Sequence, residues 1–476
     1  MKNSSNSPLI ELATGVTAGV LAPMGQLPFE VRLLSVVGVA LFFYRLQYNV
    51  GSALRTSIGF APAYFLSGQL WIYNSLLLQN DQINTYGLPV LVTIFVLPAV
   101  LIVVMTSVYL LSRKRLNIGH FTLSNCMFFS CFWVLFEFIY SFIPDSVPLL
   151  ISGYAVLGKL WDQVIPVVGV LGCSFLLVFC SSLAVCIVHH ICTANRPPLY
   201  RLIPTLLISL LFPSLLPHEN WTHPYDARIF HYQMVVNKNV DAPDNFAIRY
   251  ADPLPKLIIS GGVQADIERP HLLQQLQSIE NNSVIAFLIL MPRTESASDI
   301  FCSLGEGEGC LKKNHDDGFF PDKSVYCRPS DLSAQKPHLY RRHPSVDSYR
   351  LLILDNLDDA HPFLAAENVS GSEITVVFDI PNKGQVIRER LLHADRARAL
   401  ETGRPILRYS NVGISAAIDH KGTIVSRFLP EQIRANGQLR PMTGRTPMML
   451  VGRYGVLGLI TVILLFFCCR RMLQMM

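Results

Sequence analysis

The sequence predicts a multi-pass α-helical membrane protein that carries one large α/β domain as an insert. Of its 476 residues, 51% are hydrophobic and 15% are charged, whereas about one quarter of the residues of a soluble protein are charged. Long apolar segments cause this bias, and one long polar stretch, 218–447, precedes the last of them. The apolar content excludes a disordered chain. The net charge of +5 is small for this length and gives no indication of nucleic-acid binding.

Apolar runs long enough to approach the thickness of a bilayer define the membrane part. They lie near 9–25, 30–44, 56–78, 86–112, 121–143, 164–190, 201–217 and 449–469. No small-residue cleavage site follows the first run, so we interpret it as a retained helix and not as a secretory signal. The resulting organisation is seven transmembrane helices in 1–217, an extracytoplasmic domain in 218–447, and a last transmembrane helix with a short cytoplasmic tail in 448–476.

Basic residues in the short loops predict the orientation. If eight helices alternate, one side receives Lys2, Arg45, Arg55, Arg113, Lys114, Arg115, Arg196, Arg201, Arg470 and Arg471. The opposite short loops hold little beyond Arg32 and Lys159. We therefore expect both termini in the cytoplasm and 218–447 on the far side, which is the periplasm of a diderm bacterium. Seven helices would scatter these charges over both sides.

Glu137 is the one carboxylate deep in an expected span. An intramembrane acid is a candidate for function, because an unpaired carboxylate is costly in lipid. The alternative, which we favour, is a structural hydrogen bond to a neighbouring helix. A transporter would have more such groups and matched, interrupted helices in two halves, and this sequence lacks that pattern.

The polar insert has the periodicities of an α/β domain. β-branched or alternating runs predict strands at 229–236, 256–260, 283–291, 350–355, 373–380, 405–410 and 413–418. Apolar residues at three- and four-residue spacing predict helices at 268–280 and 385–402. Residues 305–348 have neither period and are rich in Gly, Asp, Lys, His and Ser, so we expect a long loop or lid there.

One motif near the C-terminal end makes the sequence recognisable. Residues 396–422 read Arg-Ala-Arg-Ala-Leu-Glu-Thr-Gly-Arg-Pro-Ile-Leu-Arg-Tyr-Ser-Asn-Val-Gly-Ile-Ser-Ala-Ala-Ile-Asp-His-Lys-Gly, and Thr443-Gly444-Arg-Thr446-Pro447 follows. This resembles the apolipoprotein N-acyltransferases of bacterial inner membranes, and weaker similarity extends through 67–73, 137–138, 152–154 and 167–170. The resemblance implies an inserted nitrilase-like domain, an αββα sandwich of the carbon-nitrogen hydrolase superfamily. It also predicts that Glu401 lies on a helix and that Arg404-Pro405 enter a strand.

The resemblance implies thiol chemistry without a cofactor or a metal. In the family a Cys attacks the acyl carbon of a phospholipid, a Glu removes the thiol proton and a Lys stabilises the oxyanion. The acceptor is the amine of the diacylglyceryl-cysteine at a lipoprotein's N-terminus. The Glu is expected after the strand at 256–260, where this chain has Gly262. A rival alignment uses Glu295, which lies three positions after Pro292, farther than the directly adjacent Pro and Glu of the family pattern.

The other two catalytic positions are also altered or displaced. Lys313 keeps the family's K-x-H spacing with His315 and is the best oxyanion candidate, and Arg342 before His343 is the alternative; for both, a solvated basic loop is an equal interpretation. The nucleophile position after the strand at 350–355 is Asn356, with Asp358 as its acidic neighbour. No cysteine exists between Cys327 and Cys468, so no shift of alignment supplies a thiol there.

The cysteines fall into two groups. Eight of the 11 cysteines lie in or beside apolar stretches and are expected to be inert thiols. The polar insert holds Cys302, Cys310 and Cys327, of which at most one pair can form a disulfide. Lys312 and Lys313 would lower the pKa of Cys310, which makes it a candidate substitute nucleophile, although a thiol on a flexible loop lacks rigid positioning.

The sequence therefore leads to three functional hypotheses. The first is an N-acyltransferase-like inner-membrane pseudoenzyme of lipoprotein biosynthesis, catalytically impaired because the Cys and Glu are missing, that still binds phospholipid or lipoproteins. The second is an active N-acyltransferase with a rearranged site that uses Glu295, Lys313 or Arg342, and a displaced thiol. The third is a non-catalytic lipid- or partner-binding envelope protein.

Overall fold

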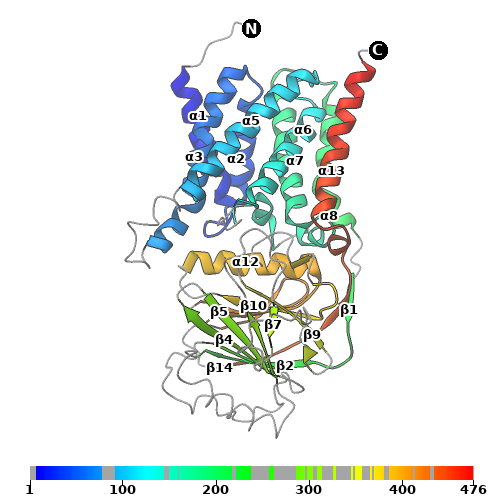
Figure 1. Cartoon of the computed structure of the whole chain (residues 1–476). Coiled ribbons are helices and arrows are strands. Elements are labelled where there is room, and N and C mark those ends of the chain that lie inside the picture. The colour runs from blue at the N-terminus through cyan, green and yellow to red at the C-terminus, as the bar shows by residue number, and fades with distance from the viewer. Residues whose placement is uncertain are drawn as a thin grey trace. The chain divides into compact units, whose positions relative to one another are not determined.

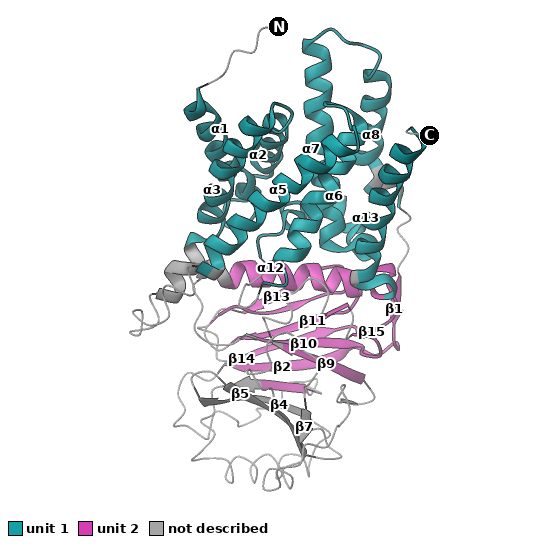
Figure 2. Ribbon diagram, turned by 45° about the horizontal axis from the view of Figure 1, so that its top comes forward, with its two compact units in different colours: residues 1–219, 450–476 teal, residues 220–449 magenta. Residues whose placement is uncertain are grey.

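The computed structural model describes two compact units, Met1–Glu219 with Leu450–Met476, and Asn220–Met449 (Figure 2). Its described residues are 7–77, 92–143, 149–158, 160–216, 221–236, 257–261, 286–294, 297–303, 308–312, 325–327, 345–346, 349–355, 365–366, 369–379, 385–410, 413–428 and 434–474. Each unit is treated by itself below.

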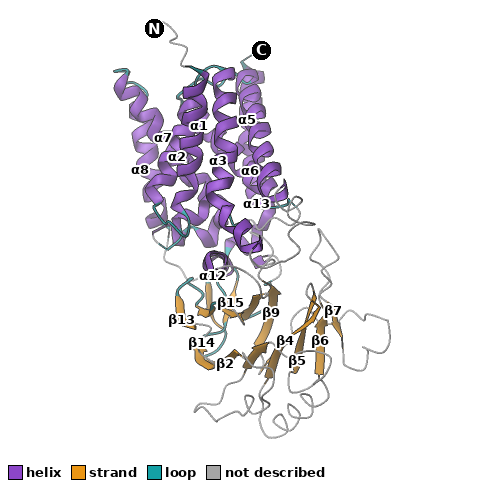
Figure 3. Cartoon of the chain, turned by 90° about the vertical axis from the view of Figure 1, so that its left-hand side faces the viewer, coloured by secondary structure: helices purple, strands orange, loops and turns teal. Residues whose placement is uncertain are grey.

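The first unit is a bundle of helices (Figures 1 and 3). Its α-helices are α1 (Pro8–Leu21), α2 (Arg32–Arg45), α3 (Val50–Leu77), α5 (Leu97–Arg115), α6 (Leu123–Tyr140), α7 (Ile165–Cys192), α8 (Leu199–Leu215) and α13 (Pro447–Leu473, which begins in the second unit). Short helical turns lie at η1 (Ala22–Gly25), η2 (Val92–Val96), η3 (Ser152–Val156) and η4 (Leu160–Gln163). Each apolar segment expected from the sequence thus contains a helix.

Five helical stretches in the described ranges are long and apolar enough to cross a membrane. They are Pro8–Gly25, Ile94–Arg115, Leu123–Tyr140, Ile165–Cys192 and Tyr454–Leu473. Their lengths match the hydrocarbon thickness of a bilayer, and many large apolar side chains on α5, α8 and α13 are exposed. The chain is therefore a membrane protein.

Hydrogen bonds bring many helix ends together at one end of this unit. Glu11 at the start of α1 accepts from Arg55 at the start of α3 at 2.5 Å, and Arg45 at the end of α2 lies 3.8 Å from the same carboxylate. Arg113 near the end of α5 donates to the carbonyl of Leu46 at 3.0 Å.

Other helices make similar contacts at this end. Asn125 of α6 donates to Gln47, and His190 of α7 forms a hydrogen bond with the carbonyl of Phe121. Arg470 of α13 donates to Ser124. Most of the basic residues singled out above belong to this one end.

The second unit is built from β-sheets. Its strands are β1 (Thr222–Pro224), β2 (Phe230–Val236), β3 (Leu257–Gly261), β4 (Ala286–Thr294), β5 (Ala297–Ser303), β6 (Glu308–Lys312), β7 (Val325–Cys327), β8 (Ser345–Val346), β9 (Tyr349–Asp355), β10 (Ile374–Asp379), β11 (Ile406–Ser410), β12 (Ser415–Ile418), β13 (Ile424–Phe428), β14 (Arg434–Leu439) and β15 (Met442–Gly444), with helix α12 (Gln385–Thr402). In the described residues they form sheets in the orders β14-β2-β3-β4-β5-β6-β7, β13-β12-β11-β10-β9-β8 and β1-β15.

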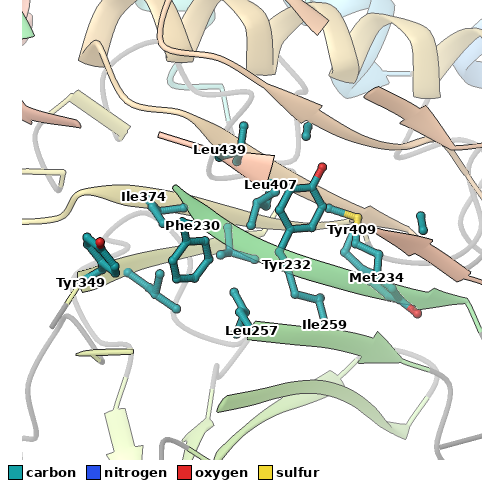
Figure 4. Packing of buried hydrophobic residues seen from close by; sticks show 14 of the residues in the cluster. Phe230, Tyr232, Met234, Leu257, Ile259, Tyr349, Ile374, Leu407, Tyr409 and Leu439 are labelled. Atoms are coloured by element: carbon teal, nitrogen blue, oxygen red, sulfur yellow. The ribbon is translucent and has the colours of Figure 1, made fainter. Parts of the chain in front are cut away.

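The two large sheets pack face to face. One buried cluster combines side chains of β2, β3 and β14 with side chains of β9, β10, β11 and β12 (Figure 4). The opposite face of the six-stranded sheet packs against α12 through Leu392 and Ala399. This α/β sandwich confirms the expected fold class, while the helix expected at 268–280 lies outside the described residues. Glu401 lies on α12, and Arg404-Pro405 lead into β11, as the motif predicted.

One prediction about this unit was wrong in part. Residues 305–348 were expected to form a long loop or lid, yet 308–312, 325–327 and 345–346 are the strands β6, β7 and β8, and the rest of the range lies outside the described residues. Pairing explains the difference, because β6 is held between β5 and β7 by antiparallel ladders. A strand with a neighbour on each side does not need the alternating pattern that a half-buried strand displays on its own.

Candidate active site

The candidate site lies where parallel strands end. β2, β3 and β4 are parallel in one sheet, and β9, β10 and β11 are parallel in the other. Gly262, the expected base position, directly follows the last residue of β3, and Asn356, the expected nucleophile position, directly follows β9. Both residues lie outside the described ranges, so their side chains are not placed. In open α/β sheets, ligands bind at such carboxyl ends.

Contacts across the sandwich align the two sets of carboxyl ends. The rings of Phe230 and Tyr349, which begin β2 and β9, lie 5.5 Å apart between centroids. At the other end, the hydroxyl of Tyr409 on β11 donates to the carbonyl of Val235 on β2 at 2.9 Å. The parallel strands of both sheets therefore run toward the same end of the sandwich, and Figure 4 shows these side chains between the sheets. The two expected catalytic positions follow strands that end on this side.

The oxyanion candidate follows a strand that ends at the same edge. β5 is antiparallel to β4, and β6 is antiparallel to β5, so β6 runs in the direction of β3. The register pairs Met291 with Asp299 and Asp299 with Lys312, which places Lys312 one step beyond the level of Gly261. β6 is three strand spacings from β3, about 14 Å along the sheet. Lys313 is the next residue and lies outside the described ranges, as does Arg342.

The rival base follows the end of β4 in the sequence. Thr294 pairs with Ala297 in the β4–β5 ladder, and Glu295 lies outside the described residues. Gly261 of β3 pairs with Leu290 of β4, and β4 continues to Thr294. Glu295 therefore follows a strand that extends about 13 Å beyond the end of β3. The end of β4 thus lies farther along the strand direction than the end of β3, where the family's base is expected.

The cysteines of the insert belong to strands. Cys302 is a residue of β5, Cys310 of β6 and Cys327 of β7. Cys310 was expected on a flexible loop, and its place in a central ladder corrects that expectation. Asp358, the expected acidic neighbour of the nucleophile, lies outside the described residues.

Two serines build the turn after β11, at the same edge. The backbone N–H of Gly413 donates to the hydroxyl of Ser410 at 2.7 Å. The hydroxyl of Ser415 donates to the carbonyl of Ser410 at 3.1 Å and accepts from its N–H at 3.0 Å. Ser410, Gly413 and Ser415 of the recognised motif are thus linked by hydrogen bonds at the end of β11. Sequence reasoning did not assign a role to these serines, although their five-residue spacing around a glycine was visible.

One buried ion pair lies within α12, and a second one fixes α12 to the sheet. Arg398 and Glu401 of α12 pair at 2.6 Å, and Arg408 of β11 pairs with Asp395 of α12 at 2.7 Å. All four residues are completely buried. Buried charges persist only when they are paired and hydrogen-bonded. These four residues therefore stabilise α12 and its packing against β11, whose neighbours β9 and β10 end at the candidate site.

Arg404 joins three segments of backbone. Its guanidinium donates to the carbonyl of Ser372 at 2.6 Å and to that of Gly444 at 2.7 Å. Burial lowers the pKa of Arg404 to about 10, although the charge of Glu373 opposes the shift. Arg404 remains charged near neutral pH. The Thr-Gly of the second motif thus supplies an acceptor for the Arg of the first.

Thr446 and Pro447 start the last helix. The hydroxyl of Thr446 accepts from the N–H of Met449 at 3.2 Å and donates to the carbonyl of Glu401. Thr at a helix N-cap and Pro at the first helical position are both favoured. The Thr-Pro of the motif therefore ends the second unit and begins α13 at a defined residue.

Glu137 is a structural acceptor in the first unit. It is fully buried, and its Oε1 accepts from the Trp133 indole at 2.9 Å and from the N–H of Ser152 at 2.7 Å. The next N–H, that of Gly153, donates to the hydroxyl of Ser174 at 2.7 Å. These bonds satisfy the start of the η3 turn between α6 and α7. They match the structural interpretation of this acid.

The described residues contain no group of three or more His, Cys, Asp or Glu side chains that can hold a metal ion.

Comparisons with known proteins find similarity to the same family as the motifs. Residues 18–183 match the family model described as the apolipoprotein N-acyltransferase N-terminal domain. The chain is 23% identical to an apolipoprotein N-acyltransferase of Coxiella burnetii over 94% of this chain and 98% of that protein. It is 24% identical to one of Pseudomonas aeruginosa over 96% of each.

Among solved structures, a CN-hydrolase superfamily protein of Xanthomonas campestris with an arsenic adduct in its active site is 13% identical, with a TM-score of 0.32 over 44% of this chain and 90% of that one. An amidase of Nesterenkonia sp. AN1 is 14% identical, with a TM-score of 0.30 over 47% of this chain and 94% of that one. The family model and the near full-length relatives agree: over almost its whole length this chain is similar to apolipoprotein N-acyltransferases.

Proposed function

We propose that this chain is a catalytically impaired N-acyltransferase of a bacterial inner membrane, which binds phospholipid or lipoproteins but transfers little or no acyl group by the family route. The family reaction moves an acyl chain from a phospholipid to the N-terminal diacylglyceryl-cysteine of a lipoprotein. The observation that carries the proposal is the identity of the residue after β9. That residue is Asn356, and the sequence has no cysteine between Cys327 and Cys468.

The missing groups remove both halves of the first chemical step. An amide side chain does not attack an ester, because its nitrogen lone pair is delocalised into the carbonyl, whereas a thiolate does. A thiol is mostly protonated near neutral pH and needs a base within reach. Gly262, which follows β3, has no side chain to act as that base. An oxyanion donor such as Lys313 stabilises nothing unless attack has occurred.

The retained scaffold supports continued binding. The buried ion pairs of α12, the serine turn after β11 and the Arg404 bridge are all present. Removal of one partner of a buried ion pair destabilises a fold by about 3–5 kcal/mol. Retention of both pairs therefore indicates that the folded state of this unit is under selection. In the described part of this unit, the framework that carries β9 to β11 is thus retained, while the residues after β3 and β9 differ from those that the family chemistry requires.

Complementation tests the loss of activity. A strain depleted of its own N-acyltransferase is supplied with this chain, and the N-terminus of a lipoprotein is measured by mass spectrometry. We expect diacylated lipoprotein and no growth, while an active relative expressed at the same level restores both. Full triacylation by the unmodified chain would overturn the proposal in favour of a rearranged site. Cys302→Ser, Cys310→Ser and Cys327→Ser would then identify the acyl-carrying thiol.

We further propose that both termini are cytoplasmic and that the second unit is periplasmic. The basic residues gathered at one end of the first unit support this orientation, because positively charged loops are retained in the cytoplasm. A reporter fused after Met476 is expected to be active only if it functions in the cytoplasm. Activity of a reporter that works only outside the cytoplasm would contradict this topology.

A further inference from the structure

We propose that Cys310 and Cys327 form a disulfide that joins β6 to β7. The ladder between these antiparallel strands pairs Cys310 directly with Cys327, Leu311 with Tyr326 and Lys312 with Val325. The two cysteines therefore occupy directly opposed positions of adjacent strands. The proposal rests on the periplasmic location of this unit and is independent of whether the chain transfers acyl groups.

The register satisfies the distance that a disulfide requires. Opposed residues of an antiparallel pair have Cα atoms about 4.5 or 5.5 Å apart, depending on the type of pair. A disulfide spans Cα separations of about 4.4–6.8 Å. Directly opposed residues also belong to the same face of a sheet. The bond can thus form without a shift of either strand.

The same register excludes the third cysteine from this pair. Cys302 of β5 is opposed by Gly309 of β6 and by Leu288 of β4, whereas Cys310 is opposed by Phe301. Because successive residues of a strand alternate between faces, Cys302 belongs to the face opposite to that of Cys310. Of the three possible pairings, the strand positions favour Cys310 with Cys327.

Formation of the bond is a two-electron oxidation. A thiolate of one cysteine attacks the disulfide of an oxidant, either a thiol oxidoreductase or a small-molecule disulfide, and displaces one of its thiols. The second thiolate then attacks the mixed disulfide and displaces the other thiol. The two cysteines lose two protons and two electrons, and the disulfide of the oxidant is reduced to two thiol groups. Disulfides form and persist in the periplasm but rarely in the cytosol.

The bond has a consequence for the site. It removes Cys310 as a substitute nucleophile, because a sulfur held in a disulfide is not a thiolate. It also anchors the strand that immediately precedes Lys313 to its outer neighbour. Cys302 is left as the one thiol of the insert that can react.

Peptide mapping tests the proposal on the full chain. Cells are treated with N-ethylmaleimide to block free thiols, and the protein is purified from membranes and digested without reductant. We expect a cross-linked peptide that contains Cys310 and Cys327, together with alkylated Cys302. In the Cys302→Ser variant the cross-link should persist, and in Cys327→Ser both Cys302 and Cys310 should be alkylated. Alkylation of both Cys310 and Cys327 in the unmodified chain, or a cross-link to Cys302, would overturn the proposal.

A second experiment distinguishes a failure of the disulfide proposal from a failure of the proposed topology. The purified, reduced chain is incubated with oxidised glutathione and mapped again. Absence of the Cys310–Cys327 peptide there contradicts the register itself. The peptide could instead form in that mixture while the protein from cells has free thiols. In that case the disulfide proposal fails in the cell. The reporter fused after Met476 then decides whether a cytoplasmic location of the second unit is the cause. Neither result depends on the complementation assay.

Discussion

Arg404 illustrates how a single motif residue supports the fold. Its guanidinium satisfies the carbonyls of Ser372 and Gly444, which belong to segments far apart in the sequence. A planar guanidinium donates in several fixed directions at once, which a lysine does not. Its removal leaves buried carbonyl groups without their donor.

We therefore expect Arg404→Met to destabilise the second unit by about 3 kcal/mol, since bonds to a charged donor contribute about 1.5–3 kcal/mol each and are partly replaced by water. Thermal unfolding of the full chain in detergent measures the effect. The exposed Arg440 is the matched control, and Arg440→Met should change the free energy of unfolding little. Equal effects of the two substitutions would rule out this role for Arg404.

His420 gives the stability of the second unit a dependence on pH. Burial lowers the pKa of His420, with a further lowering by Lys421 that Asp419 opposes. The folded state therefore binds the proton less readily than the unfolded state, whose pKa is about 6.5. The contribution to stability is fully present above that value and is lost as the pH falls through it.

In the His420→Asn variant this part of the pH dependence should disappear. We expect the melting temperature of the unmodified chain to fall more than that of the variant between about pH 7.5 and about pH 5, because only the unmodified chain gains a proton at this position on unfolding. Melting curves at both pH values test it. Parallel decreases in the two proteins would show that His420 does not contribute.

At the scale of elements, glycines set the contact between α1 and α3. A Cβ atom at Gly15 would lie 2.2 Å from the carbonyl oxygen of Thr56, and one at Gly19 would lie 2.4 Å from that of Phe60. These two glycines form the small-xxx-small pattern that allows membrane helices to approach closely. The backbone of α3 leaves no space for even a methyl group at either position.

Gly19→Ala is expected to push these helices apart and to destabilise the first unit by about 1–3 kcal/mol, the usual cost of overpacking. Gly458→Ala in α13 is the control, since nothing lies within 4 Å of a Cβ atom there. The folded yield in detergent and the melting temperature measure the difference. A Gly19→Ala protein as stable as the Gly458→Ala protein would contradict the close approach.

Elements with a strong local period could be predicted from the sequence, and those defined by their partners could not. α12 was expected at 385–402 because its apolar residues recur every three or four positions, and the structure gives the same bounds. β5, which reads Ala-Ser-Asp-Ile-Phe-Cys-Ser, has no clear alternation and forms through its ladders with β4 and β6. Register across a sheet is a long-range property, so no local pattern encodes it.

At the scale of the whole molecule, the candidate site depends on two sheets at once. The sequence could indicate that Gly262 and Asn356 follow strands, because each strand has its own apolar run. It could not indicate that both strands end on the same side of the sandwich, since that follows from the contacts of Tyr409 with Val235 and of Phe230 with Tyr349. The position of Lys313 beyond β6 likewise depends on the path through β4 and β5.

This dependence determines what restores activity. Catalytic residues that act together are not additive: loss of the nucleophile alone removes several orders of magnitude of rate, and loss of the base then changes little more. The same reasoning applies in reverse. Asn356→Cys alone should not restore acyl transfer, because its thiol has no base, and Gly262→Glu alone should not, because its base has no thiol.

The double variant Asn356→Cys with Gly262→Glu is the one expected to gain measurable acyl transfer, provided that Lys313 reaches the oxyanion. Triacylated lipoprotein in the depleted strain is the measurement, and Lys313→Met in the double variant should abolish the gain while Lys323→Met should not. Folded yield is compared for all variants, so that loss of protein is distinguished from loss of chemistry. Activity in the Asn356→Cys protein alone would mean that another residue already serves as the base, and Glu295, which follows β4 in the sequence, would be the first candidate.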